Sequence, residues 1–212
     1  MKKRILCFGD SNTYGYTPDG DRYDEEVRWP TRMARLLGDG YAVIEEGLNG
    51  RTCVFDDPVE GGYRSGVAYL PPCVMSHNPL DLVILMLGTN DTKARFSASA
   101  VNIGRAMSQL VRAAGEYALD AAGKRPRILV VSPAPILDHV MQTRHAGFGP
   151  QAPEVSRGLA REYRLISKLM RCDYMDAAGL TEVSQQDAVH LTAEGHRLLA
   201  EAMAEKVRDL IG

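Results

Sequence analysis

Two kinds of hydrophobic pattern alternate along this chain. Short runs dense in apolar residues predict five strands, at residues 4–8, 41–46, 80–87, 127–131 and 173–176. Between them, apolar residues at three- and four-residue spacing predict five helices, at residues 27–37, 65–76, 98–122, 154–170 and 192–211. Strands that alternate with helices in this way are typical of an open α/β sheet with right-handed crossovers.

The third and fourth predicted strands are apolar on successive residues rather than on alternate ones, at residues 82–87 and 128–131. Such runs are typical of parallel strands that are covered by helices on both faces. No charge run, Gly/Ser linker or internal repeat divides the chain, so we expect one domain over residues 1–212. The long irregular stretch at residues 132–153 follows a strand, and we expect it to border a ligand site at the carboxyl edge of the sheet.

Composition narrows the classes of protein. Hydrophobic residues make up 45% of the 212 residues and charged residues 25%, as in ordinary globular domains, and the formal net charge is −2. A charge so close to zero gives no reason to expect nucleic acid or a membrane as a partner. The apolar run after the basic start ends at Gly9, too early for a secretion signal, and no run approaches the roughly 18 residues of a membrane span. We therefore expect a cytoplasmic protein.

The spacing of the cysteines and histidines predicts neither a metal site nor a disulfide. Cys7, Cys53, Cys73 and Cys172 form no CxxC pair, and the five histidines form no HExxH pattern. Cysteines in or beside apolar segments, as three of these are, pack as small hydrophobic groups. We expect no structural metal and no cofactor.

A candidate nucleophile follows the first predicted strand, in the sequence Gly9-Asp10-Ser11. A glycine there lets the chain turn sharply, so that Ser11 begins the next segment at the carboxyl edge of the sheet, where a hydroxyl can meet a substrate. Two alternatives stay open at this point, a phosphate-binding turn and a serine that only caps a helix. Neither of the glycine motifs that bind phosphates, GxxxxGK[ST] and GxGxxG, is present.

A candidate base lies just before the last predicted helix, where Asp187 precedes His190 by three residues. One tight turn at this spacing places the carboxylate on the imidazole, which fixes the tautomer of a base that takes the proton of Ser11. The alternative is a loop aspartate that caps the helix beside a solvent-exposed histidine. His196 is a poorer base, because it lies about one turn into the helix and has no acidic residue three positions before it.

Two further segments at strand ends offer hydrogen-bond donors for an oxyanion. Asn90, in the sequence GTND, follows the third strand, and its side-chain amide can donate. Gly50 follows the second strand, and its backbone N–H can act as a second donor. Taken singly, each is also explained by a plain turn, an Asx turn for Asn90 and a glycine-containing loop for Gly50.

Together, the GDS sequence ending at Ser11, Gly50, the GTND sequence around Asn90 and the DxxH sequence from Asp187 to His190 resemble the four blocks of the SGNH (GDSL-type) hydrolases. The resemblance implies a three-layer α/β/α flavodoxin-like sandwich with a five-stranded parallel sheet, and metal-independent hydrolysis of esters. It implies that Ser11 is the nucleophile of a catalytic triad completed by His190 and Asp187. It also implies an oxyanion hole built from the Ser11 N–H, the Gly50 N–H and the Asn90 side chain.

Longer strings are similar to bacterial arylesterases that also act as acyltransferases and perhydrolases, at residues 4–11, 43–48, 80–84 and 86–93. This similarity implies a serine esterase for small acyl esters, acetyl above all, with acyl transfer as a further activity. It also implies that Asp10, Asn12, Tyr14 and Asn49 lie near the bound substrate. A carbohydrate acetylesterase, a thioesterase and a lysophospholipase stay alternatives within the family. Outside it, the alternative is a non-catalytic flavodoxin-like binder of phosphate or nucleotides.

Two segments, residues 17–30 and 132–153, are long for connections in a compact α/β domain. They carry apolar side chains that a small monomer has difficulty covering: Tyr23, Trp29, Ile136, Val140, Met141 and Phe148. In the resembling arylesterases, the matching loops help to build a large assembly that narrows the entrance to the site. We therefore expect a homo-oligomer larger than a dimer, an octamer being one form. The alternative is a monomer whose loops fold over its own pocket.

Overall fold

A computed structural model describes residues 2–212 and places five parallel strands in one sheet. The strands are β1 (Lys3–Gly9), β2 (Tyr41–Gly47), β3 (Leu82–Met86), β4 (Arg127–Ser132) and β5 (Asp173–Asp176). Their order in the sheet is β2-β1-β3-β4-β5, with every neighbouring pair parallel. This is the strand order of flavodoxin-like folds, as the resemblance implied.

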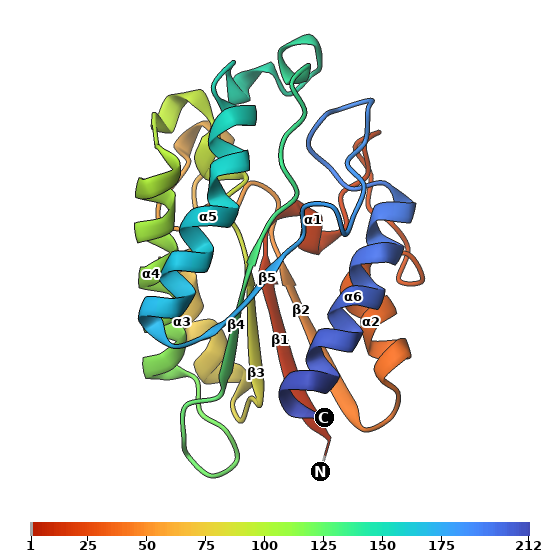
Figure 1. Cartoon of the computed structure of the whole chain (residues 1–212), viewed down its shortest axis with the longest axis vertical. Helices are drawn as coiled ribbons and strands as arrows, with labels where there is room; N and C mark the ends of the chain where they lie inside the picture. The colour runs from red at the N-terminus through yellow and green to blue at the C-terminus, as the bar shows by residue number, and fades with distance from the viewer. Residues whose placement is uncertain (1) are drawn as a thin grey trace.

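Helices cover both faces of the sheet and complete three layers (Figure 1). They are α1 (Ser11–Tyr14), α2 (Trp29–Leu37), α3 (Gly66–His77), α4 (Ala100–Tyr117), α5 (Ala152–Met170) and α6 (Ala193–Ile211). Helices α3, α4 and α5 lie on one face, and α2 and α6 pack together on the other (Figure 1). The predicted α/β/α sandwich is confirmed. None of the helices in the described part of the chain is long and apolar enough to cross a membrane.

The central strands divide their side chains between two cores. In β1, Leu6 and Phe8 belong to the core under α3, α4 and α5, whereas Ile5 and Cys7 belong to the core under α2 and α6. Strands β3 and β4 alternate in the same way. Because both faces of these strands are covered, each successive position is apolar, which explains the unbroken hydrophobic runs in the sequence.

Several boundaries differ from the sequence prediction, and two of them are explained by local contacts. Strand β3 begins at Leu82 rather than at residue 80, because the N–H of Leu80 donates to the carbonyl of Leu119, outside the sheet. Helix α4 ends at Tyr117 rather than at residue 122, since Ala118 has an extended backbone. The short helix α1 was not predicted, and the stretch 132–153 contains two 3-10 turns, at Val140–Gln142 and Ala146–Phe148.

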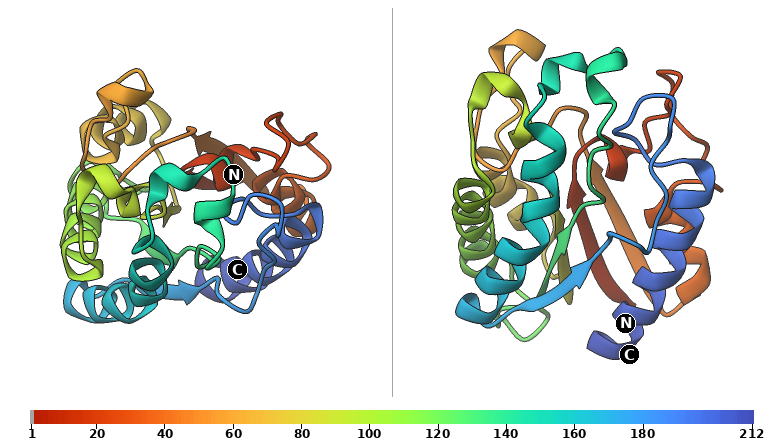
Figure 2. Two further views of the ribbon diagram at one scale, coloured as in Figure 1. Left: turned by 90° about the horizontal axis from the view of Figure 1, so that it is seen from above. Right: turned by 45° about the horizontal axis from the view of Figure 1, so that its top comes forward.

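The loops that follow the strands gather at one end of the molecule, opposite the two termini (Figure 1, Figure 2). This end carries the carboxyl ends of all five strands, since the strands are parallel. In sheets of this type, ligands bind at the carboxyl ends of the strands. The fold therefore brings the four candidate segments of the sequence to one place.

Candidate active site

Ser11 begins α1 directly after β1, at a turn that only glycine fits. A Cβ on Gly9 would collide with the side chain of Thr13 and lie 2.9 Å from the Met86 carbonyl oxygen. Asp10 then caps α1, accepting the N–H of Asn12 at 2.9 Å. The close turn leaves the Ser11 side chain at the edge of a cavity and 6% exposed.

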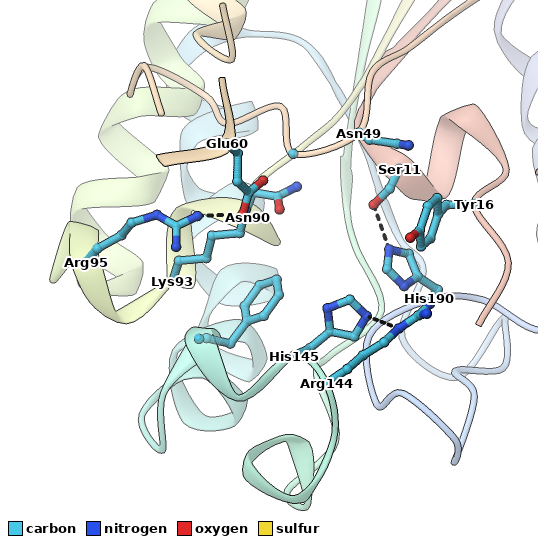
Figure 3. A pocket seen from close by; sticks show the side chains of 13 residues that line it. Ser11, Tyr16, Asn49, Glu60, Asn90, Lys93, Arg95, Arg144, His145 and His190 are labelled. Carbon is cyan, nitrogen blue, oxygen red and sulfur yellow. Dashed lines mark hydrogen bonds and ion pairs between the residues drawn. The ribbon is translucent and has the colours of Figure 1, made fainter. Parts of the chain in front are cut away.

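His190 bridges Ser11 and Asp187. Its Nε2 lies 2.9 Å from the Ser11 Oγ, and its Nδ1 lies 2.7 Å from the Asp187 Oδ2 (Figure 3 shows the contact with Ser11). The other carboxylate oxygen, Oδ1 of Asp187, accepts the N–H groups of Val189 and His190 at 3.0 Å each. The tight turn that the DxxH spacing predicted is therefore present, and it holds carboxylate, imidazole and hydroxyl in one line.

The local environment favours a neutral imidazole beside a charged carboxylate. Burial lowers the pKa of His190, and the neighbouring Asp187 only partly opposes this effect. Burial works to raise the pKa of Asp187, but hydrogen bonds with His145 and His190 outweigh it and hold that pKa well below its usual range. At neutral pH His190 is thus an available base, and Asp187 an anion that can stabilise the imidazolium.

A cavity of about 340 Å³ opens beside the Ser11 hydroxyl. Its walls come from all the loops at the carboxyl edge: Ser11, Tyr16, Asn49, Gly50, Glu60, Asn90, Lys93, Arg95, Arg144, His145, Gly147, Phe148 and His190. The stretch 132–153 contributes four of these residues, so it borders the cavity as its position in the sequence predicted. The volume suits a small ligand.

The two predicted oxyanion donors line the cavity together with Ser11. The Asn90 Nδ2 donates one hydrogen to the Arg51 carbonyl at 3.1 Å, which fixes the amide and leaves its second hydrogen free of that bond. Gly50 has a left-handed backbone with φ of 77°, and a Cβ there would lie 2.6 Å from the Glu60 Oε2. A glycine at this position therefore keeps the loop close to the cavity.

Three of the four residues predicted to lie near the substrate do not line the cavity; only Asn49 does. Asp10 is 1% exposed and caps α1, and burial raises its pKa to about 6. The amide of Asn12 bonds to the backbone on both sides of His190, accepting from Leu191. The ring of Tyr14 packs under the Arg22 guanidinium, 4.1 Å from its centroid. Asp10 and Asn12 thus make contacts within the two turns that hold Ser11 and His190, and the predicted place of Asp10, Asn12 and Tyr14 near a substrate stays a prediction.

His196, which the sequence ranked below His190 as a base, is fully buried and does not line the cavity. Its Nδ1 accepts the N–H of Trp29 at 3.3 Å, and its ring packs against Tyr23 at a centroid distance of 5.2 Å. Burial lowers the pKa of His196 to about 3. The residue therefore serves as a neutral packing element.

Sequence reasoning missed Tyr16 and His145, which flank the imidazole of His190. The His145 Nε2 lies 3.6 Å from the Asp187 Oδ2, and the centroids of the His145 and His190 rings are 5.1 Å apart, with an angle of 65° between the ring planes. The Tyr16 ring, which also lines the cavity, lies 4.8 Å from that of His190 (Figure 3). Only the predicted proximity of residues 132–153 to the site pointed toward His145.

A charged shelf, formed by Glu60, Lys93 and Arg95, makes the wall of the cavity away from His190 (Figure 3). The Lys93 Nζ lies 2.5 Å from the Glu60 Oε1 and 3.6 Å from the Oδ2 of the fully buried Asp57. Arg95 contacts the same two carboxylates at 2.5 and 2.6 Å. The cavity is thus polar on this side. Lys93 and Arg95 lie two and four residues after the GTND sequence, but nothing in the sequence linked them to Glu60.

The apolar side chains that motivated the oligomer prediction are mostly covered within one chain. Trp29, Ile136, Val140 and Phe148 are at most 5% exposed, and Met141 is 46% exposed. Ile136, Val140 and Phe148 form a small core of their own with Ala152, Ala188 and Val189, whereas Trp29 belongs to the core under α2 and α6. The premise that a monomer leaves these groups uncovered therefore fails for four of the six side chains, and the assembly stays a prediction.

The fold and this site define a hydrolase with its nucleophile candidate at the end of the first strand. Residues 7–198 match the model of the GDSL-like Lipase/Acylhydrolase family, which covers most of the chain. The chain belongs to this family, and it is a carboxylic ester hydrolase. The resemblance found in the sequence is thereby confirmed.

Solved structures of esterases superimpose on nearly the whole chain. The aryl esterase of M. smegmatis is 39% identical, with 99% of this chain and 100% of that chain covered and a TM-score of 0.90. A carbohydrate acetylesterase from Sinorhizobium meliloti is 38% identical, with the same coverage and a TM-score of 0.88. An acetylxylan esterase of Xylanibacter ruminicola is 23% identical over 97% of this chain, which spans only 43% of that enzyme.

Proposed function

We propose that the protein is a serine esterase whose catalytic triad is Ser11, His190 and Asp187, acting on esters with small acyl groups. The observation that carries the proposal is the alignment of the Ser11 Oγ, the His190 ring and the Asp187 carboxylate, with contacts of 2.9 and 2.7 Å, at the edge of the cavity.

In the acylation step, the His190 Nε2 takes the proton of Ser11 while the Oγ attacks the ester carbonyl. Asp187 holds the His190 Nδ1–H and stabilises the imidazolium that forms. Negative charge develops on the carbonyl oxygen, and the proposed donors to it are the Ser11 N–H, the Gly50 N–H and the Asn90 amide. When the tetrahedral intermediate collapses, the alcohol leaves with the proton from His190.

In the deacylation step, His190 takes a proton from water, which attacks the acyl-enzyme and releases the acid and Ser11. An alcohol or hydrogen peroxide in place of water gives acyl transfer or perhydrolysis, the further activities that the resemblance implies. In each case His190 takes the proton of the nucleophile that attacks the acyl carbon. The balance between water and other acceptors is then set by how the cavity binds the acceptor.

The charged shelf favours a second, narrower candidate, an acetylesterase for polar alcohols such as carbohydrates. Glu60, Lys93 and Arg95 offer both donors and acceptors across the cavity from His190, and hydroxyl groups of a sugar can use both. The similarity to a carbohydrate acetylesterase supports this reading. The charged shelf offers few apolar contacts to a long acyl chain.

Covalent labelling tests the nucleophile. An organophosphate should label Ser11 alone, with loss of aryl acetate hydrolysis, and Ser11→Ala should lower kcat/KM by about 10⁴-fold or more. The matched control is Ser108→Ala on α4, whose hydroxyl bonds only to its own helix and which should keep full activity. Near-normal turnover by Ser11→Ala would make the triad assignment wrong.

A panel of substrates separates the two candidates. Aryl esters from acetyl to dodecanoyl should show activity falling steeply as the acyl chain lengthens. Peracetylated sugars should be deacetylated at a rate comparable with aryl acetate if the shelf binds the alcohol. Light scattering tests the assembly in the same preparation, and a mass near the 23.3 kDa of one chain would contradict the predicted oligomer.

A further inference from the structure

A second cluster of reactive side chains lies between α3 and the edge strand β2. Tyr69, Cys73 and His77 follow one another at four-residue spacing, so they share one face of α3. That face meets Glu46, near the carboxyl end of β2. The preceding residue, Glu45, points to the other face of the sheet and pairs with Arg28 at 3.0 Å. Of the two adjacent carboxylates, one is thus neutralised by arginine, and the other faces a thiol and an imidazole.

The contacts within this cluster are close. The His77 Nε2 lies 3.0 Å from the Glu46 Oε1, and the Tyr69 hydroxyl lies 3.4 Å from the Glu46 Oε2. One atom each from Glu46, Cys73 and His77 lies within 4.8 Å of the other two. Cys73 is 2% exposed, whereas the His77 and Glu46 side chains are 31% and 19% exposed. The Cys73 thiol is therefore buried beneath the other two groups, whereas the Glu46 carboxylate and the His77 imidazole are accessible to solvent.

These dimensions suit a transition-metal ion. Zinc binds histidine nitrogen and carboxylate oxygen at about 2.0–2.2 Å, so a tetrahedral ion holds such a pair about 3.3 Å apart. The separation of 3.0 Å between His77 and Glu46 is close to this value without any movement. Zinc binds thiolate at about 2.3 Å, and the Cys73 sulfur lies within 4.8 Å of both other ligand atoms. The set also fits zinc chemically, because thiolate and imidazole prefer borderline or soft cations to Mg²⁺ or Ca²⁺.

We propose that Glu46, Cys73 and His77 bind a divalent transition-metal ion of the zinc class, with solvent in the remaining position. None of the three residues lines the cavity beside Ser11, so this site is separate from the esterase chemistry. It departs from the sequence expectation of no structural metal. Cys73 and His77 carry no recognised ligand spacing along the chain, and the third ligand comes from another element.

The neighbours of the cluster leave Glu46 available to a cation. The Arg51 side chain lies nearby, but its Nη1 donates to the backbone carbonyls of Gly9 and Glu46, and its guanidinium stacks over the Phe8 ring at 4.2 Å. The Cys73 thiol binds a metal ion as thiolate and must therefore lose its proton. The ion replaces that proton, which is released to solvent.

A bound ion would tie the end of β2 to α3. The chain that follows β2 leads directly to Asn49 and Gly50 in the cavity wall, so the tie would hold the base of this loop. Because a ligand that binds only the folded state stabilises it, the expected consequence is a higher melting temperature and no change in the chemical step. This proposal does not depend on the proposed function.

Cobalt substitution tests the site directly. The purified protein, stripped with chelator, should bind one Co²⁺ and show a thiolate-to-metal charge-transfer band in the near ultraviolet, displaced by Zn²⁺. Cys73→Ser should abolish the band, and His77→Gln should weaken binding by about 100-fold or more. The matched control is Cys172→Ser, which removes a half-buried thiol elsewhere and should leave the band intact. Far-ultraviolet circular dichroism checks that each variant is folded.

The band also separates this site from the group formed by His145, Asp187 and His190, which contains no sulfur. Zn²⁺ should raise the melting temperature of the wild type and of Ser11→Ala, but not that of His77→Gln. Aryl acetate hydrolysis should persist in excess chelator. Failure to detect saturable binding at micromolar Co²⁺ or Zn²⁺, or a band that survives Cys73→Ser, would overturn the proposal whatever the outcome for the triad.

Discussion

The side-chain oxygen of Asn12 accepts the backbone N–H of Leu191 at 3.0 Å. Asn12 follows the proposed nucleophile and Leu191 follows the proposed base, so this bond joins the two turns 179 residues apart in sequence. The Asn12 Nδ2 also lies 3.4 Å from the Val189 carbonyl, as donor. One buried amide thus brackets His190 from both sides and sets its position relative to Ser11.

Replacing Asn12 should therefore reduce catalysis without removing a reacting group. We expect Asn12→Ala to lower kcat by roughly 10- to 100-fold with little change in KM, because a small displacement of the base from the hydroxyl slows proton transfer. Steady-state kinetics with aryl acetate measures both constants. Asn102→Ala on the exposed side of α4 is the control and should behave as wild type. A rise in KM with kcat unchanged would instead indicate that Asn12 contacts the substrate.

Asn90 should act mainly in the transition state. We expect Asn90→Ala to lower kcat by roughly 10²–10³-fold with a smaller effect on KM, since charge reaches the carbonyl oxygen only as Ser11 attacks. Asn90→Asp offers a comparison of similar size that places an acceptor where a donor is required, and it should be at least as slow. If only KM changed, Asn90 would be a ground-state contact or a turn residue.

In the pH profile of kcat/KM, the fall in activity on the acid side (the acid limb) should occur below the pKa of a free imidazole. Burial lowers the pKa of His190, so the neutral base should persist below about pH 6.5, and kcat/KM should fall only as the pH drops through that lowered pKa. The Arg144 charge contributes to the lowering, so Arg144→Gln should move the limb to higher pH. Arg208→Gln on α6 is the matched control. A wild-type limb above pH 7 would contradict this account.

Asp91 should make the folded state less stable as the pH rises. Its two oxygens accept the Cys53 N–H at 3.0 and 2.9 Å, and burial raises its pKa to about 7, above the value of 3.8 for an exposed aspartate. The protonated form is favoured on folding, so its stabilising effect is full below about pH 4 and is lost as the pH rises through about 7.

The test is the stability of Asp91→Asn relative to wild type across this range. From about pH 4 to about pH 8 the variant should gain on the order of 3 kcal/mol relative to wild type, as urea unfolding would show. The isosteric amide keeps an acceptor for the Cys53 N–H but carries no charge. A difference in unfolding free energy that does not vary with pH would show that Asp91 does not titrate there.

Much of the architecture is readable from local periodicity. The unbroken apolar runs of β3 and β4 required cover on both faces, and the alternation of strands with helices required a parallel sheet. In such a sheet all carboxyl ends share one edge, so Ser11, Asn90 and His190 had to meet there although they are far apart in sequence. The DxxH spacing also determined its own turn, because a carboxylate reaches an imidazole three residues away without help from the rest of the chain.

The tertiary structure alone decided where each remaining side chain found its partners. The sequence did not show which groups the Asn12 amide contacts, because its partners at residues 189–191 lie at the far end of the chain. Likewise, Trp29 is buried because α6 packs over it. Glu46 contacts His77 because α3 packs beside β2. A sequence pattern reports which face of an element is apolar, since that follows from the backbone repeat. It does not report which distant polar group satisfies a given amide or carboxylate, because that depends on how the elements pack.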